Sequence, residues 1–118
     1  MADYTPYIAA QVNLADHTLT YNLYTLLQAL DASAVPATVT PYTCAELSVQ
    51  SSNANTATKL IFIGDQSIDT ANPPTRYGVE LLPGGIYQRR RVSSNISLSA
   101  ITLRTDTDNL KVNILLAE

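Results

Sequence analysis

The sequence predicts a mostly β fold: a β-sandwich or jelly-roll-like domain with one short helix at about residues 19–31. Two observations support this class. After Pro41, short apolar runs separated by turn residues recur along the chain, as in proteins built from short strands. Only 14% of the residues are charged, so the helix formers Glu and Lys are scarce and neutral side chains such as the strand-favouring Thr must cover the surface.

The length and charge of the chain limit the kinds of domain and partner that we expect. With 118 residues the chain has a common length for one domain, so we expect a single core across residues 1–118. The net charge of -3 gives no general attraction to nucleic acid or to an anionic membrane. Residues 1–7 have neither the basic region nor the apolar stretch of a secretory signal, which predicts synthesis in the cytoplasm.

One helix is predicted from the spacing of large apolar residues along a single helical face. These residues are Leu19, Leu23, Leu26, Leu27 and Leu30. Candidate N-caps are Asp16, Thr18 and Thr20, and Pro36 disfavours continuation of the helix. A helix of about twelve residues is too short to be stable alone, so we expect its leucines to pack on the strands.

Three strands are predicted in the first half of the chain. A short strand is expected at Ile8–Leu14. In residues 45–50 apolar and polar side chains alternate, which indicates a strand with one solvent-facing side, and residues 51–56 suit a hairpin loop. Residues 59–63 are apolar on both faces, so we expect a central strand covered on both sides that ends at Gly64.

The second half begins with a loop, because the pair Pro73-Pro74 within residues 66–76 cannot donate ladder hydrogen bonds. Residues 77–82 and 86–92 are predicted as strands of a hairpin, joined by a tight turn at residues 83–85.

The last two predicted strands follow this hairpin. The apolar parity changes near Ser99, which indicates a β-bulge or a bend. A turn at residues 106–109 precedes a final alternating strand at residues 110–116. The count is therefore about seven strands and one helix.

No catalytic constellation or cofactor motif is recognisable, so we expect no enzymatic activity, no metal and no cofactor. His17 is the only histidine and is interpreted as a surface or capping residue. Cys44 is the only cysteine, which excludes an intramolecular disulfide and favours a small buried side chain; a reactive pair with His17 is the less favoured alternative.

Acidic residues occur in two pairs, which are Asp65 with Asp69 and Asp106 with Asp108. Carboxylate oxygens of such pairs can bind a hard cation. Acidic residues among Ser, Thr and Asn more often form turns by hydrogen bonding to the nearby backbone, and we favour that interpretation.

The candidate interface residues are two clusters of aromatic and basic side chains. The first comprises Tyr87, Arg89, Arg90 and Arg91, in which strand alternation places Arg89 and Arg91 on the side of Tyr87, and Arg90 on the other side. Charges of this kind can protect an edge strand from aggregation. Alternatively they can anchor a protein partner, since Arg and Tyr are enriched at protein–protein interfaces. The second comprises Tyr4 and Tyr7 in residues 1–7, a possible docking arm.

Two segments resemble small virion proteins of tailed phages. In residues 59–67 an apolar strand ends in Gly-Asp, and in residues 77–85 a Gly-x-x-Leu-x-Pro-Gly turn follows. The helix and the strand that begins at Cys44 also fit this pattern, so the resemblance covers about residues 18–92. These motifs belong to turns and carry no catalytic residues.

The resemblance implies a capsid cement or decoration protein on the surface of the virion, made in the host cytoplasm. Its partners would be the major capsid protein or other virion proteins, and it would form a homo-oligomer, either a dimer or a trimer. Two alternatives remain at the level of the sequence. The chain could be a tail, neck or fibre component, or a carbohydrate-binding β-sandwich module.

Overall fold

The computed structural model describes residues 8–30, 43–65, 67–94 and 96–117. In this part of the chain there are ten strands, one α-helix and one 3-10 helix, so the prediction of a mostly β fold is confirmed. Their order is β1 (Ile8–Leu14), β2 (Tyr21–Asn22), α1 (Leu23–Leu30), β3 (Thr43–Cys44), β4 (Glu46–Ser51), β5 (Ile61–Gly64), β6 (Val79–Leu81), β7 (Ile86–Arg90), β8 (Ile96–Ser97), η1 (Leu98–Ala100), β9 (Thr102–Thr105) and β10 (Leu110–Ala117).

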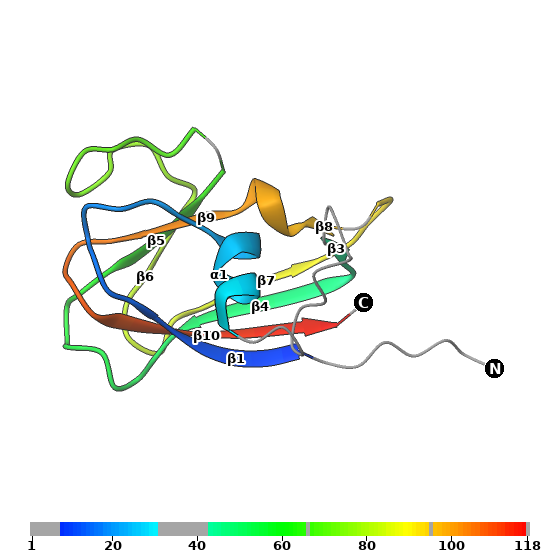
Figure 1. Ribbon diagram of the computed structural model, residues 1–118, viewed down its shortest axis with the longest axis horizontal. Helices are drawn as coiled ribbons and strands as arrows, with labels where there is room; N and C mark the ends of the chain where they lie inside the picture. Colours follow the sequence, from blue (N-terminus) through cyan, green and yellow to red (C-terminus); the bar gives the residue numbers. More distant parts are fainter. Residues whose placement is uncertain (1–7, 31–42, 66, 95, 118) are drawn as a thin grey trace.

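The strands form two four-stranded antiparallel sheets and one small pair. Sheet A has the order β1-β10-β4-β7, sheet B has the order β2-β9-β5-β6, and β3 pairs with β8. In Figure 1, β10 and β4 run through the lower part of the view, β9 and β5 through the upper part, and α1 lies between them. Strands that are distant in the sequence are therefore neighbours in both sheets.

β10 is a central strand of sheet A and confirms the alternation predicted for the end of the chain. It pairs with β1 from Leu14↔Leu110 to Ile8↔Leu116, and with β4 from Ser51↔Val112 to Glu46↔Ala117. Its even-numbered residues from Leu110 to Leu116 are buried and the residues between them are exposed or half-buried. Sheet A thus has one apolar face and one solvent-facing side.

A single apolar cluster fills the space between sheet A, sheet B and the helix. Its buried members are Val12, Leu14, Leu23, Leu27, Cys44, Leu47, Val49, Ile61, Ile63, Leu81, Ile96, Leu98, Ile101, Leu103, Leu110, Val112, Ile114 and Leu116. Both sheets contribute alternate residues to it, as expected when one face of each sheet is removed from water.

The helix is present but starts later than predicted. Tyr21 and Asn22 pair with β9 as β2, and the Asn22 side chain caps the helix by accepting a hydrogen bond from the Thr25 N–H over 3.2 Å. The predicted caps were therefore wrong, and Leu19 is 50% exposed in the preceding turn. Leu23 and Leu27 are fully buried, so the expectation that the helix packs its leucines on the strands is confirmed for these two residues.

Both predicted hairpins are wrong, because each turn connects strands of different sheets. Residues 51–56 lead from β4 in sheet A to β5 in sheet B, and residues 82–85 lead from β6 in sheet B to β7 in sheet A. The second turn itself forms as expected: Gly84 has φ +85, and the Gly85 N–H donates to the Leu82 carbonyl over 2.7 Å. The residues of a turn determine that the chain reverses direction there. Which strands then pair is determined by the burial of their apolar side chains in the shared core.

The change of apolar parity near Ser99 is produced by η1 and not by a β-bulge. The single turn of 3-10 helix lets Leu98 and Ile101 both enter the core, where they are 0% and 4% exposed. The predicted bend is therefore confirmed, and the predicted bulge is wrong.

β5 is covered on both faces, as predicted. Ile61 and Ile63 face the core, while Phe62 is 2% exposed on the opposite side of sheet B. There the Phe62 ring meets the Tyr77 ring edge to face at a centroid distance of 4.8 Å. Tyr77 lies near the end of an irregular segment, residues 65–78 as far as the structure describes it, which we call the 65–78 loop.

Two side chains of β9 hold this loop against sheet B. Arg104 is fully buried and donates hydrogen bonds to the Asp69 carbonyl at 2.7 Å, to the His17 carbonyl at 3.2 Å and to the Asn72 side-chain oxygen. Thr102 donates through its hydroxyl to the Asp65 carbonyl over 2.7 Å. The buried guanidinium has no carboxylate partner among the described residues. Backbone and amide oxygens replace water at its two terminal nitrogens, while its Nε is buried without a hydrogen-bond partner.

Replacing Arg104 by Lys should destabilise the fold although the charge is kept. A Lys side chain has one donor nitrogen, whereas Arg104 bonds its three oxygens from two separate nitrogens of a planar fork. Each lost hydrogen bond to a charged group costs about 1.5–3 kcal/mol, so we expect a loss of about 3 kcal/mol in the free energy of unfolding. Urea denaturation of Arg104→Lys measures this loss. The control is Arg76→Lys in the exposed part of the 65–78 loop, which should change stability little; equal effects of both variants would contradict the assigned role.

Candidate protein-binding surface

The side of sheet A that faces away from the core is a regular surface formed by four strands. Each strand of the sheet contributes every second residue to it. The contributing residues are Ala9, Gln11, Asn13, Glu46, Ser48, Gln50, Ile86, Gln88, Arg90, Lys111, Asn113 and Leu115, and all are exposed or half-buried. We call this surface the outer face of sheet A.

The register of the four strands places the uncharged members of this face, except Asn13, in two adjacent rows. Across β1, β10, β4 and β7, one row reads Ala9, Leu115, Ser48, Gln88, and the next reads Gln11, Asn113, Gln50, Ile86. Within the rows the Gln11 amide donates to the Asn113 side-chain oxygen over 2.9 Å. The centre of the face therefore carries amides, a hydroxyl and apolar groups, and its charges lie at the margins.

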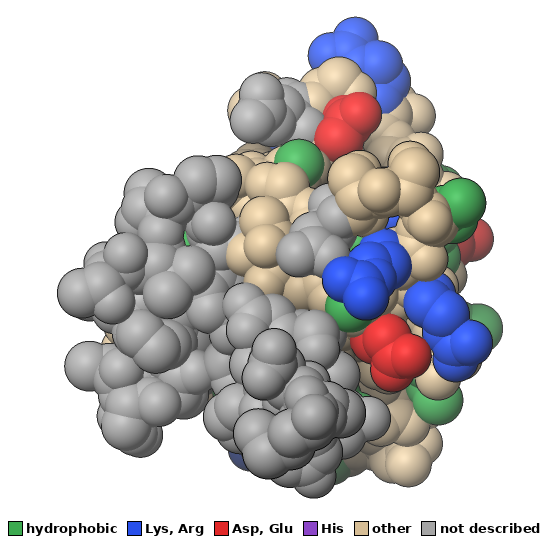
Figure 2. Space-filling view, turned by 90° about the vertical axis from the view of Figure 1, so that its right-hand side faces the viewer, with side chains coloured by type: hydrophobic (Ala, Val, Ile, Leu, Met, Phe, Trp, Pro, Cys, Tyr) green, Lys and Arg blue, Asp and Glu red, His purple; other side chains and the backbone are tan. Residues whose placement is uncertain are grey.

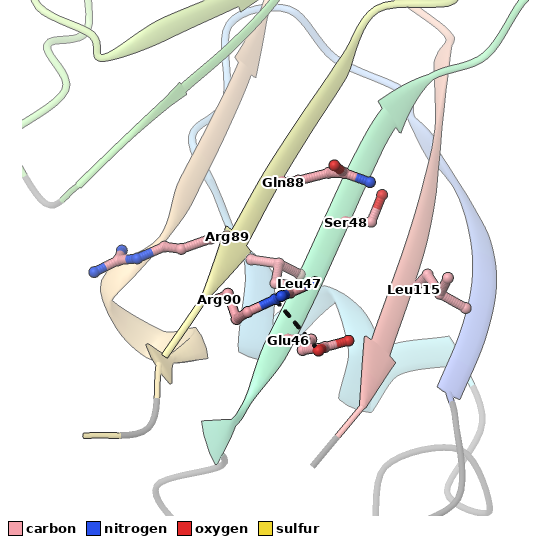
Figure 3. Close-up of a pocket in the computed structure, with 7 residues that line it drawn as sticks. All are labelled: Glu46, Leu47, Ser48, Gln88, Arg89, Arg90 and Leu115. Carbon is pink, nitrogen blue, oxygen red and sulfur yellow. Dashed lines mark ion pairs between the residues drawn. The ribbon is translucent and has the colours of Figure 1, made fainter. Parts of the chain in front are cut away.

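Two depressions lie on this face and share Ser48 and Leu115. The first has a volume of about 430 Å³ and is lined by Glu46, Leu47, Ser48, Gln88, Arg89, Arg90 and Leu115 (Figure 3). The second has a volume of about 420 Å³ and is lined by Ala9, Ala10, Gln11, Ser48, Gln50, Asn113, Ile114 and Leu115. Leu115 and Ile86 are 43% and 54% exposed, so apolar side chains are available to a partner at and beside these depressions.

The arginine cluster lies at one end of the outer face. Arg90 stands beside Gln88 on this face, as predicted, and its Nε is 3.4 Å from the Glu46 carboxylate. Figure 2, which views the right-hand end of the molecule of Figure 1, shows basic and acidic side chains close together. Both side chains of the pair are well exposed to water, so the ion pair contributes little to stability.

The other predicted interface residues are in different surroundings. Tyr87 is half-buried and packs against the core, whereas Arg89 is exposed and extends from β7 on the side away from β4 (Figure 3). Arg91 follows the strand, and its backbone N–H donates to the Ala45 carbonyl over 2.8 Å. Tyr4 and Tyr7 lie outside the described residues.

His17 and Asp108 lie in turns at the surface of the molecule. The Asp108 carboxylate accepts a hydrogen bond from the His17 N–H over 2.9 Å, and the His17 Nδ1 lies 2.6 Å from the same oxygen. Together with Asp16 they form a group whose potential ligand atoms lie within 4.8 Å of one another. Asp16 in turn accepts from the N–H and the hydroxyl of Thr18.

The predicted carboxylate pairs are engaged in the same way. Asp65 accepts from the N–H and hydroxyl of Ser67, Asp69 accepts from Thr75, and Asp106 accepts from the Leu60 N–H over 3.0 Å. The Asp65 contacts are the local bonds of a turn-forming residue. Asp69 reaches six residues along its loop, and Asp106 accepts from an N–H that is 46 residues away in the chain. Cys44 is fully buried in the core cluster, the place expected for it.

The turn hydrogen bonds make stability depend on acid. Bonds from Ser67 lower the pKa of Asp65, and bonds from Thr75 lower the pKa of Asp69, both from an ordinary value of 3.8. Bonds from Thr18 and from His17 likewise lower the pKa of Asp16 and of Asp108. A carboxylate whose pKa is lower in the folded state binds fewer protons there, so its contribution is present above pH 3.8 and is lost as the pH falls through the folded value.

We therefore expect the urea midpoint of unfolding to decrease as the pH is lowered from about 5 to 2. The Asp69→Asn variant should be less stable than the wild type at neutral pH, and its midpoint should fall less over the same interval, because one of the four shifted groups is gone. Denaturation series at several pH values measure both effects. A slope unchanged by Asp69→Asn would show that this carboxylate does not contribute to the acid dependence.

No helix within the described ranges is long and apolar enough to span a bilayer. Comparison of the chain with protein-family models and with curated proteins finds no match. The basis for a functional proposal is therefore the chemistry of the described surfaces, chiefly the outer face of sheet A.

Proposed function

We propose that this chain is a structural protein that binds other proteins without catalysis, and that it acts as a capsid cement or decoration protein on a tailed-phage virion. The observation that carries the proposal is the outer face of sheet A, on which two uncharged rows lie between charged margins. The phage assignment itself is supported by the resemblance of residues 59–67 and 77–85 to such virion proteins.

The neutral character of this face suits a large contact with another protein. Burial of a charged side chain carries a high desolvation cost, whereas amide and hydroxyl groups lose less and can form new hydrogen bonds with the partner. Leu115 at the centre and Ile86 at the side add apolar area. A protein bound across neighbouring subunits of the major capsid protein would stabilise the assembled shell, because it binds that state in preference to the dissociated one.

The fold proposed with this function is a β-sandwich of jelly-roll type. Sheet A and sheet B both supply the single core cluster, and the turns after β4 and β6 carry the chain from one sheet to the other. In such an arrangement the outer face of sheet A stays available to a partner, while the 65–78 loop covers the outside of sheet B.

Locating the chain in imaged virions tests the proposal. A cement protein should occupy repeated positions on the shell in numbers set by icosahedral symmetry, and particles that lack it should lose their genome at a lower temperature. A position on tail, neck or fibre would replace the capsid assignment by that alternative. A chain found only in the lysate and never on particles would refute the virion function.

Substitution of Leu115 by Lys should abolish attachment to the shell while the protein still folds. The added charge would have to be buried at the centre of the contact, so we expect at least a tenfold loss of affinity for particles that lack the protein. The matched control is Leu82→Lys, since Leu82 is 55% exposed beyond the end of β6 in sheet B. Cosedimentation with particles measures binding; equal losses for both variants would exclude the outer face as the contact.

A further inference from the structure

β7 is an edge strand whose backbone is paired on one side only. Among the described strands it pairs with β4 alone. The ladder is bounded by hydrogen bonds from the Ser51 N–H to the Gly85 carbonyl at 2.9 Å and from the Arg91 N–H to the Ala45 carbonyl at 2.8 Å. Because antiparallel bonding alternates between residues, Ile86, Gln88 and Arg90 direct their N–H and C=O groups away from β4.

We infer that two copies of the chain form a dimer by antiparallel pairing of their β7 edges about a two-fold axis at Gln88. This pairing joins two copies of sheet A into one continuous sheet. It opposes Gln88 to the second copy's Gln88, and Arg90 to the second copy's Ile86. The inference goes beyond the proposed virion function and does not depend on it.

The charges of the strand select this register over the neighbouring ones. A two-fold axis at Arg89 or at Arg90 would place that arginine directly against its own copy, and like charges in direct opposition are destabilising. An axis at Tyr87 would oppose Arg90 to Gly84, whose N–H already donates to the Ser51 carbonyl over 2.7 Å. Only the axis at Gln88 uses all three free residues of β7 without opposing like charges.

Side chains on both faces of the paired strands also become complementary in this register. On the outer face the aliphatic stem of Arg90 covers the second copy's Ile86, which is 54% exposed in the single chain. On the other face Arg89 is opposite the second copy's Tyr87, and in Figure 3 Arg89 already extends past the free edge of β7. Arginines on an edge strand disfavour pairing with other strands. In β7 they disfavour every register considered above except the one with the axis at Gln88.

The other described sheet edges offer less to a second copy. β2 and β6 have two and three residues, so each provides few free backbone groups. β1 has seven residues and no charge, and it is the competing edge that an experiment must separate from β7.

Single cysteines placed at the centres of the two long edges distinguish them. In a dimer centred on Gln88 the two Cα atoms of residue 88 form a hydrogen-bonded pair at about 5.5 Å, within the range of a disulfide. Gln88→Cys should therefore give a disulfide-linked dimer under mild oxidation. Gln11→Cys at the exposed centre of β1 is the matched control and should stay monomeric on a denaturing gel, as should the wild type, whose Cys44 is buried.

Two results would overturn the inference. One is a wild-type protein that sediments as a monomer at every concentration up to the millimolar range. The other is equal or greater cross-linking of Gln11→Cys, which would assign the contact to β1 or to random collision.

Introducing a negative or a positive charge at position 86 tests the register of the paired strands. Ile86→Glu should tighten the dimer several-fold, because each new carboxylate faces Arg90 of the other copy, and Ile86→Arg should weaken it several-fold. Both variants should keep the urea midpoint of the wild-type monomer, since the position is exposed. Sedimentation equilibrium measures the dissociation constants; the same change in both variants, or changes of the opposite sign, would refute the pairing of residue 86 with Arg90.

Discussion

Alternate burial along the strands of sheet A is the constraint on which the other features of the molecule depend. β10 lies between β1 and β4, and its even-numbered residues enter the same core as those of sheet B. Once these residues are fixed inward, every second residue of the neighbouring strands is fixed outward. The outer face of sheet A is thus set by the core, and its few charges follow from the low charge content of the sequence.

The sequence predicted those elements whose pattern is local. Period-two alternation identified β4 and β10, and the absence of a polar side identified β5 as a strand covered on both faces. Strand pairing was not local: turn residues at positions 83–85 are compatible with a hairpin and equally with a crossing between sheets. The helix start was also missed, because pairing of β2 with β9 competes with the apolar helical pattern.

The same distinction holds for the candidate surface. Arg90 was correctly placed beside Gln88 by alternation within one strand. The neutral rows could not be assembled from the sequence, since their members come from four strands whose order and register depend on long-range burial. Arg104 was missed because an isolated cation in a strand ordinarily faces water; the only hint was the long Pro-containing segment, which needed something to hold it.

The burial of Arg104 beneath the 65–78 loop has a consequence for the dynamics of the molecule. Lifting the 65–78 loop from sheet B would separate the guanidinium from its partners Asp69 and Asn72 and would remove Tyr77 from the Phe62 ring. If only part of the loop opened, the guanidinium would lose these hydrogen bonds but would gain few contacts with water. The loop is therefore expected to exchange its amide hydrogens as one cooperative unit, at a free energy below that of global unfolding, while sheet A remains closed.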